Sequence, residues 1–119
     1  MKLQTGHIEI FVKNPLTAKD FYINVLGFEL EVIQEGKNEN KFVWLKNDNR
    51  VLLLRPGNPQ QQDTYQKTNI AFVIYTDDLN KAKEHFNSKG IDFKGTDGSE
   101  DCLTLTDEDG NWFQLVENL

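Results

Sequence analysis

Short runs rich in β-branched residues, in which the side-chain character alternates, recur along the chain and predict β-strands. The run from Gly6 to Val12 has a later counterpart from Thr68 to Ile74. Each run is followed by a segment with apolar residues at three- and four-residue spacing, which is typical of an amphipathic helix. The sequence therefore predicts two similar halves, each opening with a strand that leads into a helix.

The remaining apolar runs extend this repeat. In the first half, a helix is expected to begin at Pro15 and to stop at Gly27. The further strands expected in this half are Phe28–Ile33, Phe42–Leu45 and Val51–Arg55. The second half repeats the order with a helix that stops at Gly90, followed by the strands Ile91–Phe93, Leu103–Leu105 and Trp112–Val116. Each half is thus predicted to be a βαβββ module, and the chain an α+β protein made by internal duplication.

Side chains on a strand point alternately to opposite faces, so the predicted strands have two faces. One face is uniformly apolar and is expected to pack against the helices: Ile8, Ile10, Val12, Leu52, Leu54, Ile70, Phe72, Leu103, Leu105, Phe113 and Leu115. The other face mixes aromatic and polar side chains: His7, Glu9, Phe11, Phe42, Trp44, Val51, Leu53, Arg55, Asn69, Ala71, Val73, Cys102, Thr104, Trp112, Gln114 and Val116. Aromatic walls with a few polar groups indicate a small-molecule pocket.

The length of 119 residues fits a single domain of two half-size modules, because units of about 55 residues are marginally stable alone. We expect module 1 to span residues 1–55 and module 2 to span residues 68–119. The segment between them, residues 56–67, contains two prolines and has no apolar period. It is interpreted as a linker.

The formal net charge of -6 argues against a nucleic-acid partner or an anionic membrane, whose phosphates require a surface rich in Lys and Arg. A cationic or neutral small ligand fits the acidic composition better. Cys102 is the only cysteine, which excludes a disulfide within the chain. The N-terminal residues have neither the apolar run of a signal peptide nor that of a transmembrane segment, so we expect a cytoplasmic protein.

His7 and Glu9 are the candidate catalytic residues. His7 can act as a metal ligand or general base, and the alternative is an ordinary strand histidine that is hydrogen-bonded. Glu9 shares a face with aromatic side chains. It is therefore either partly buried with a raised pKa or paired with Arg55 or His7, unless the sheet edge leaves it in water.

The two tryptophans, Trp44 and Trp112, both fall on the mixed face. They can stack a planar ligand or hold a cation, or they can pack at the interface of a dimer. Arg55 can bind a carboxylate or phosphate with two parallel hydrogen bonds, or it can simply lie at the pocket rim.

Two segments carry a family resemblance: the helix end Phe21-Tyr22-Ile23-Asn24-Val25-Leu26-Gly27-Phe28 and the closing Asp109-Gly110-Asn111-Trp112-Phe113-Gln114-Leu115. With the strand that begins near His7, they resemble the vicinal-oxygen-chelate superfamily, which includes glyoxalase I, extradiol dioxygenases and bleomycin-resistance proteins. The resemblance implies paired βαβββ modules whose curled sheets enclose a cavity, often within a homodimer.

The resemblance also implies where a metal would bind. Family members with metal chemistry carry a divalent ion on side chains from the first and last strands of each module. Those positions correspond here to His7, Leu53, Asn69 and Gln114. Leucine cannot coordinate a metal, and the neutral amides lack the charge that makes such a site tight. We therefore expect no cofactor and regard a divalent metal as disfavoured.

Three functions remain open. The first is sequestration of a planar or cationic small molecule, as in bleomycin-resistance proteins. The second is a glyoxalase-like or dioxygenase-like metalloenzyme with a reduced site at His7 and Gln114 and Glu9 as an extra ligand. The third is acid–base chemistry without a metal through His7 and Glu9. The predicted ligand-binding residues are His7, Glu9, Phe11, Phe42, Trp44, Arg55, Asn69, Thr104, Trp112 and Gln114.

Overall fold

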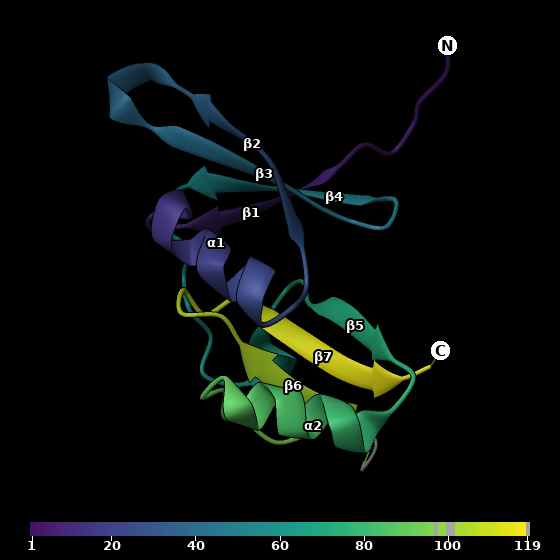
Figure 1. Cartoon of the computed structure of the whole chain (residues 1–119). Helices are drawn as coiled ribbons and strands as arrows, with labels where there is room; N and C mark the ends of the chain where they lie inside the picture. Colours follow the sequence, from purple (N-terminus) through teal and green to yellow (C-terminus); the bar gives the residue numbers. More distant parts are fainter. Residues whose placement is uncertain (97, 100–101, 119) are drawn as a thin grey trace. The chain divides into compact units, whose positions relative to one another are not determined.

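The computed structural model describes residues 1–96, 98–99 and 102–118 and divides the chain into two compact units, Met1–Pro59 and Gln60–Leu119 (Figure 1). Each unit has its own helix and its own mixed sheet, in which the first and last strands pair in parallel. The predicted α+β class with two modules is confirmed. Among the described strands, neither sheet closes on itself. Within the same residue ranges, no helix is both long and apolar enough to span a membrane.

Unit 1 has the complete βαβββ order. Its elements are β1 (Ile8–Val12), α1 (Pro15–Asn24), β2 (Glu29–Glu35), β3 (Lys41–Asn47) and β4 (Arg50–Pro56), with the short 3₁₀ turn η1 (Lys37–Glu39) between β2 and β3. The strand order in the sheet is β1-β4-β3-β2. β1 pairs with β4 in parallel, and the other neighbours are antiparallel. The predicted strands of this half are therefore present. The first begins slightly later than expected, and the other three are longer than expected.

The local sequence sets the bounds of α1. The side chain of Asn14 accepts a hydrogen bond from the backbone N–H of Leu16, which caps the helix, and Pro15 occupies the first turn. The helix ends at Asn24, slightly before the expected stop at Gly27, which follows with a positive φ of 81°. α1 packs on β3 and β4.

The predicted apolar face of unit 1 forms its core. Tyr22 from α1 is fully buried against this layer. The buried strand residues on the helix side of the sheet are Ile10, Val12, Val43, Leu45, Leu52 and Leu54. Ile8, at the start of β1, is an exception with an exposed fraction of 47%. Because the apolar residues face the helix, the alternate residues of the same strands occupy the opposite face of the sheet.

Unit 2 repeats the plan with fewer strands. It contains the 3₁₀ turn η2 (Tyr65–Lys67), β5 (Phe72–Thr76), α2 (Leu79–Ser88), β6 (Cys102–Thr106) and β7 (Trp112–Glu117), with the strand order β5-β7-β6. The side chain of Asp78 caps α2 by accepting a hydrogen bond from the backbone N–H of Lys81. The core of this unit consists of Phe86, Leu105, Phe113 and Leu115 with Trp112.

Two predictions for unit 2 are wrong. Residues Ile91–Phe93 do not form the expected strand. Instead, the following residues run irregularly beside β6, where Lys94 and Gly95 exchange backbone hydrogen bonds with Thr104. Gly95 has a φ of 95°, which interrupts extended pairing. In addition, the strand expected to open at Thr68 begins at Phe72, so Asn69 precedes β5.

Candidate functional site

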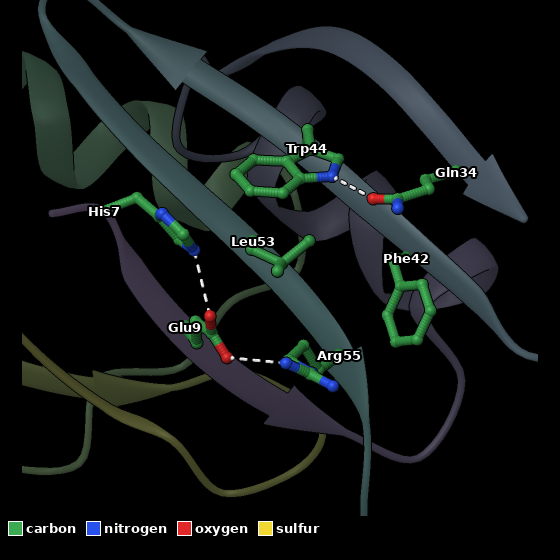
Figure 2. Close-up of a pocket in the computed structure, with 7 residues that line it drawn as sticks. All are labelled: His7, Glu9, Gln34, Phe42, Trp44, Leu53 and Arg55. Atoms are coloured by element: carbon green, nitrogen blue, oxygen red, sulfur yellow. Dashed lines mark hydrogen bonds and ion pairs between the residues drawn. The ribbon is translucent and has the colours of Figure 1, made fainter. Parts of the chain in front are cut away.

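The sheet register of unit 1 brings residues that are distant in sequence into one row. Glu9 on β1 lies opposite Leu53 on β4, and Leu53 lies opposite Trp44 on β3. These positions alternate with the buried apolar residues, so the row lies on the face away from the core. A pocket of about 250 Å³ opens here, lined by His7, Glu9, Gln34, Phe42, Trp44, Leu53 and Arg55 (Figure 2).

A chain of hydrogen bonds links the charged groups of this pocket. The ring Nε2 of His7 donates to Oε2 of Glu9 at 2.9 Å, and a guanidinium N–H of Arg55 donates to Oε1 of the same carboxylate at 3.1 Å. Exposed fractions of 32%, 34% and 41% for the His7, Glu9 and Arg55 side chains leave all three accessible to a ligand. Of the alternatives for Glu9, pairing is the one observed, with both expected partners.

This pairing also determines the ionisation of Glu9. The hydrogen bond from His7, followed by that from Arg55, lowers the pKa of the Glu9 carboxyl below its usual value. Burial opposes the effect but is too slight to reverse it. The carboxyl is therefore charged across the physiological pH range, and its charge is shared between two donors.

Aromatic rings form the walls of the pocket. The His7 ring lies 4.6 Å from the ring of Trp44, centroid to centroid, with a tilt of 59°. The indole Nε1 of Trp44 donates to Oε1 of Gln34 at 2.9 Å. The guanidinium carbon of Arg55 lies 5.1 Å from the centroid of the Phe42 ring, a cation–π contact. Leu53 is buried and forms the floor between these groups (Figure 2).

Gln34 is a pocket residue that the sequence analysis missed. It lies on β2 opposite Phe42 on β3. Alternation was not followed through this strand, and a register shift between Leu30 and Val32 changes the phase part of the way along it. The sequence did contain a signal for this residue. Gln34 is polar and comes two positions after Val32, so it points to the same side of β2, which is the neighbour of β3 in the sheet.

The structure places three other predicted ligand-binding residues outside this pocket. Phe11 lies opposite Arg55 in the sheet, but it is half exposed and packs over Gly57. Asn69 is exposed ahead of β5, and Gln114 is half-buried on β7 opposite Thr104. Their roles in ligand binding stay predictions.

Two further predicted residues, Thr104 and Trp112, are buried within unit 2. The Thr104 hydroxyl donates to the carbonyl oxygens of Lys94 and Gly95 at 3.1 and 3.2 Å. The indole Nε1 of Trp112 donates to the carbonyl oxygen of Gln62 at 3.0 Å, and the Tyr65 ring stands edge-on to its ring. The segment between residues 60 and 67 therefore covers the side of the sheet that was predicted to face a ligand. The ligand-binding roles of these two residues also stay predictions.

The duplicated pattern of a helix on one face of a mixed sheet, with a polar and aromatic pocket on the other face of unit 1, defines the class of protein. A family profile described as the Glyoxalase/Bleomycin resistance protein/Dioxygenase superfamily matches residues 4–115. The chain therefore belongs to this family, and the resemblance drawn from the two sequence segments is confirmed. A comparison with curated proteins gives no significant match.

Solved structures with the same fold include fosfomycin resistance proteins. FosX from Listeria monocytogenes, complexed with Mn(II) and sulfate ion, is 21% identical with a TM-score of 0.76, and the match covers 100% of this chain and 95% of that one. FosX from Mesorhizobium loti is 13% identical with a TM-score of 0.78, and coverage is 100% and 94%. An E126Q mutant of the Listeria protein, complexed with Mn(II) and 1S,2S-dihydroxypropylphosphonic acid, is 20% identical with a TM-score of 0.77, with coverage of 100% and 95%.

These structures correct one expectation. We expected no cofactor because only His7 remained among the four family ligand positions. Proteins of this fold are solved with bound Mn(II), so the expectation of no cofactor is wrong. Its physical weakness was that it counted ligand positions one by one. It gave too little weight to Glu9, which lies at hydrogen-bond distance from His7 on the same face of the sheet.

Proposed function

We propose that this chain is a metal-assisted enzyme that acts on a small molecule held in the unit 1 pocket, with His7 and Glu9 as its chemically active residues. One observation carries the proposal: His7 Nε2 and Glu9 Oε2 lie 2.9 Å apart at the pocket wall. Two adjacent ligands of an octahedral ion, each about 2.1 Å from it, are separated by about 3 Å. The pair therefore has the spacing of two neighbouring metal ligands, and a bound ion would take the place of the proton that His7 Nε2 now donates to Glu9.

The chemistry of the donors also fits a divalent ion. An imidazole nitrogen and a carboxylate oxygen suit Mn²⁺, Fe²⁺ or Zn²⁺. Arg55 binds the other oxygen of Glu9, as outer partners of ligating carboxylates do. Among the residues that the structure describes, no group of three or more His, Cys, Asp or Glu side chains is placed to hold a metal ion. The remaining coordination positions of the ion would be filled by neutral donors, by water or by oxygens of the bound molecule. This predicts weak binding of the metal.

The other residues of the pocket position these two. A bound divalent ion would act as a Lewis acid and polarise an oxygen of the substrate. Arg55 fixes the orientation of the Glu9 carboxylate, and the Trp44 ring supports the imidazole of His7. Leu53 closes the floor and excludes water from beneath the site. The volume of about 250 Å³ lies below the range of about 300–1,000 Å³ for drug-sized ligands, so a small substrate is expected.

Sequestration without turnover is the second candidate, and the aromatic walls favour it. Trp44 and Phe42 can stack a planar molecule whether or not a reaction follows. The expected preference for a cationic or neutral ligand rested on the net charge of -6, which is a property of the whole chain. Within this pocket the carboxylate of Glu9 is paired with both His7 and Arg55, so the pocket itself gives no preference for a cation. A planar ligand remains the better candidate for sequestration.

Metal binding by the full-length chain tests the proposal. Metal-free protein is titrated with Mn²⁺, and the free ion is followed by electron paramagnetic resonance. Replacing His7 by Ala should weaken Mn²⁺ binding by roughly tenfold or more, because it removes one of the two ligands. The matched control is His85→Ala, which changes the other histidine, on α2, and should leave binding unchanged. Absence of Mn²⁺ binding, or equal binding by the two variants, would contradict the proposal.

Turnover separates the enzyme from the sequestering protein. Fosfomycin is the first probe, because the solved structures with this fold include fosfomycin resistance proteins. A new ³¹P resonance that grows only in the presence of Mn²⁺ would support the enzyme. In metal-free samples, a shifted or broadened fosfomycin resonance without a new product would favour sequestration. An unchanged spectrum would exclude this compound both as a substrate and as a ligand.

A further inference from the structure

We propose that Arg55 and Gln34, on either side of the Phe42 ring, form a subsite that binds the acidic group of the ligand. The ligand is then a small planar molecule with a carboxylate, bound with its acidic end at this subsite and its other end toward His7 and Trp44. The inference rests on the proposed function for the choice of pocket, but it does not depend on the metal.

Gln34 presents its amide nitrogen to the pocket. The indole N–H of Trp44 can only donate, so it fixes the carbonyl oxygen of the Gln34 amide on its own side. The amide nitrogen is thereby turned away from Trp44, toward Phe42 (Figure 2). Within the described ranges, this nitrogen has no protein acceptor. Its two N–H groups are therefore available to a ligand at the pocket.

Arg55 has further N–H donors on the side of the pocket where Phe42 lies. Its guanidinium carries five N–H donors in a planar fork, and Glu9 takes one of them among the residues that the structure describes. The second terminal nitrogen lies away from Glu9, toward Phe42 (Figure 2). Stacking on the Phe42 ring and the bond to Glu9 hold the guanidinium in place, so a ligand would meet a preformed donor edge.

The arrangement of the two donor groups selects for an oxyanion. Gln34 lies opposite Phe42 in the sheet, and Arg55 stacks over the same ring. Donors thus flank an aromatic surface, and an anionic group with two oxygens can accept from both. Arginine binds a planar carboxylate with parallel hydrogen bonds, which are about twice as strong as neutral ones. A flat body attached to the carboxylate can then lie along the wall formed by Phe42 and Trp44.

The negative charge of Glu9 allows a test of the direction in which ligand binding should change. Its charge is close to the guanidinium and repels a second anion, although hydrogen bonds from two donors partly offset that charge. Substituting Glu9→Gln keeps the shape of the side chain and removes the negative charge. If the ligand binds Arg55 through a carboxylate, this variant should bind it more tightly than the unmodified protein does.

The test uses benzoate and its neutral analogue benzamide as probes, with the full chain in the presence of a chelator. Binding is followed through the indole ¹⁵N–¹H resonance of Trp44. Benzoate should bind, and benzamide should bind roughly tenfold more weakly or worse. Arg55→Gln should weaken benzoate binding by roughly 10- to 100-fold. Arg50→Gln is the matched control, because it alters the other arginine, which does not line the pocket.

Gln34→Glu completes the set. The new carboxylate can still accept the hydrogen bond from Trp44, but it replaces the amide donors with an acceptor, so benzoate binding should weaken several-fold or more. Well-dispersed amide spectra of each variant establish that it is folded. Any of three results would contradict the subsite. The first is equal binding of benzoate and benzamide by the unmodified chain, and the second is no binding of benzoate by that chain. The third is an equal effect of Arg55→Gln and Arg50→Gln.

The outcomes separate this inference from the proposed function. If the protein binds benzoate more tightly than benzamide but does not bind Mn²⁺, the subsite is supported and the metal-assisted enzyme is contradicted. If Mn²⁺ binds through His7 while benzoate and benzamide behave alike, the enzyme stands and the subsite falls.

Discussion

The carboxylate of Glu9 is held from both sides, by His7 through one oxygen and by Arg55 through the other. Neither partner is a neighbour that helix or turn geometry would supply. His7 is two residues away on the same face of an extended chain, and Arg55 comes from the parallel strand next to β1. The result is a charged group whose position is fixed even though a third of its surface remains exposed.

The titration of Glu9 provides the first prediction. Because its pKa is lowered in the folded chain, the contribution of its pairing to stability is fully present above the pKa of the unfolded chain. It is lost only as the pH falls through the lowered folded value. Replacing His7 by Ala, or Arg55 by Gln, removes one cause of the shift. Each should raise the titration midpoint of Glu9 in metal-free protein, as measured by ¹³C NMR of the side-chain carboxyl. An unchanged midpoint in both variants would contradict the pairing.

Single residues also show what a sequence can predict. Alternation placed His7, Glu9, Trp44 and Arg55 on one face. All four line the same pocket, and the sheet register positions Glu9, Trp44 and Arg55. The choice between an unpaired Glu9 and a paired one depended on side-chain geometry across two strands, which no local pattern encodes. Gln34 was missed for a related reason, since the register shift in β2 alters which residues share a face.

At the scale of elements, β6 is bound on one side by an irregular segment that contains Lys94 and Gly95, instead of by a regular strand. The buried hydroxyl of Thr104 donates to two consecutive carbonyl oxygens, those of Lys94 and Gly95. The backbone of Thr104 bonds to the same two residues. One threonine therefore attaches this segment to the sheet at a place where Gly95 prevents regular pairing.

The second prediction concerns this anchor. Thr104→Val keeps the shape of the side chain but removes the donor, which deprives the carbonyl oxygen of Lys94 of its hydrogen bond from this hydroxyl. The free energy of unfolding should fall by about 1 kcal/mol, measured by chemical denaturation. Thr106→Val makes the same change two residues along β6, at a half-buried position, and should alter it by about 0.5 kcal/mol or less. Similar losses in the two variants would show that the hydroxyl of Thr104 has no anchoring role.

The elements of the two units were not equally predictable. In unit 1, strong alternation and clear capping residues predicted every helix and strand. In unit 2, the run Ile91–Phe93 had the composition of a strand, but its pairing was decided by the glycine that follows and by backbone contacts with Thr104. The segment of residues 56–67 was interpreted as a linker from its composition. Its packing on Trp112 through Gln62 and Tyr65 is a tertiary contact that composition does not encode.

Over the whole molecule, the two halves share a plan and differ in the use of the face opposite the helix. In unit 1 this face carries an open pocket with Trp44 in its wall. In unit 2 the other tryptophan, Trp112 on β7, is 2% exposed beneath the segment of residues 60–67. The duplication was visible in the sequence, whereas the difference in exposure was not, because the covering segment lies outside the repeated pattern.

This asymmetry gives the third prediction. The chain has one tryptophan in each unit, so Trp112→Phe leaves Trp44 as the sole indole fluorophore and Trp44→Phe leaves Trp112. Addition of benzoate should change the emission of the Trp112→Phe protein, because its remaining indole lines the pocket. The emission of the Trp44→Phe protein should stay constant after correction for absorption by the ligand. A response confined to Trp112 would place the ligand in unit 2 and contradict the assignment.

The parallel pairing of β1 with β4 makes the chemistry of unit 1 depend on completion of the whole unit. Glu9 is synthesised early and its partner Arg55 late, and the two meet only when the last strand enters the sheet beside the first. A nascent chain released before that strand emerges from the ribosome has the histidine and the carboxylate but not the arginine that holds the carboxylate in place. A chain that ends before β4 would therefore lack both Arg55, which holds the Glu9 carboxylate, and Leu53, which lines the same pocket.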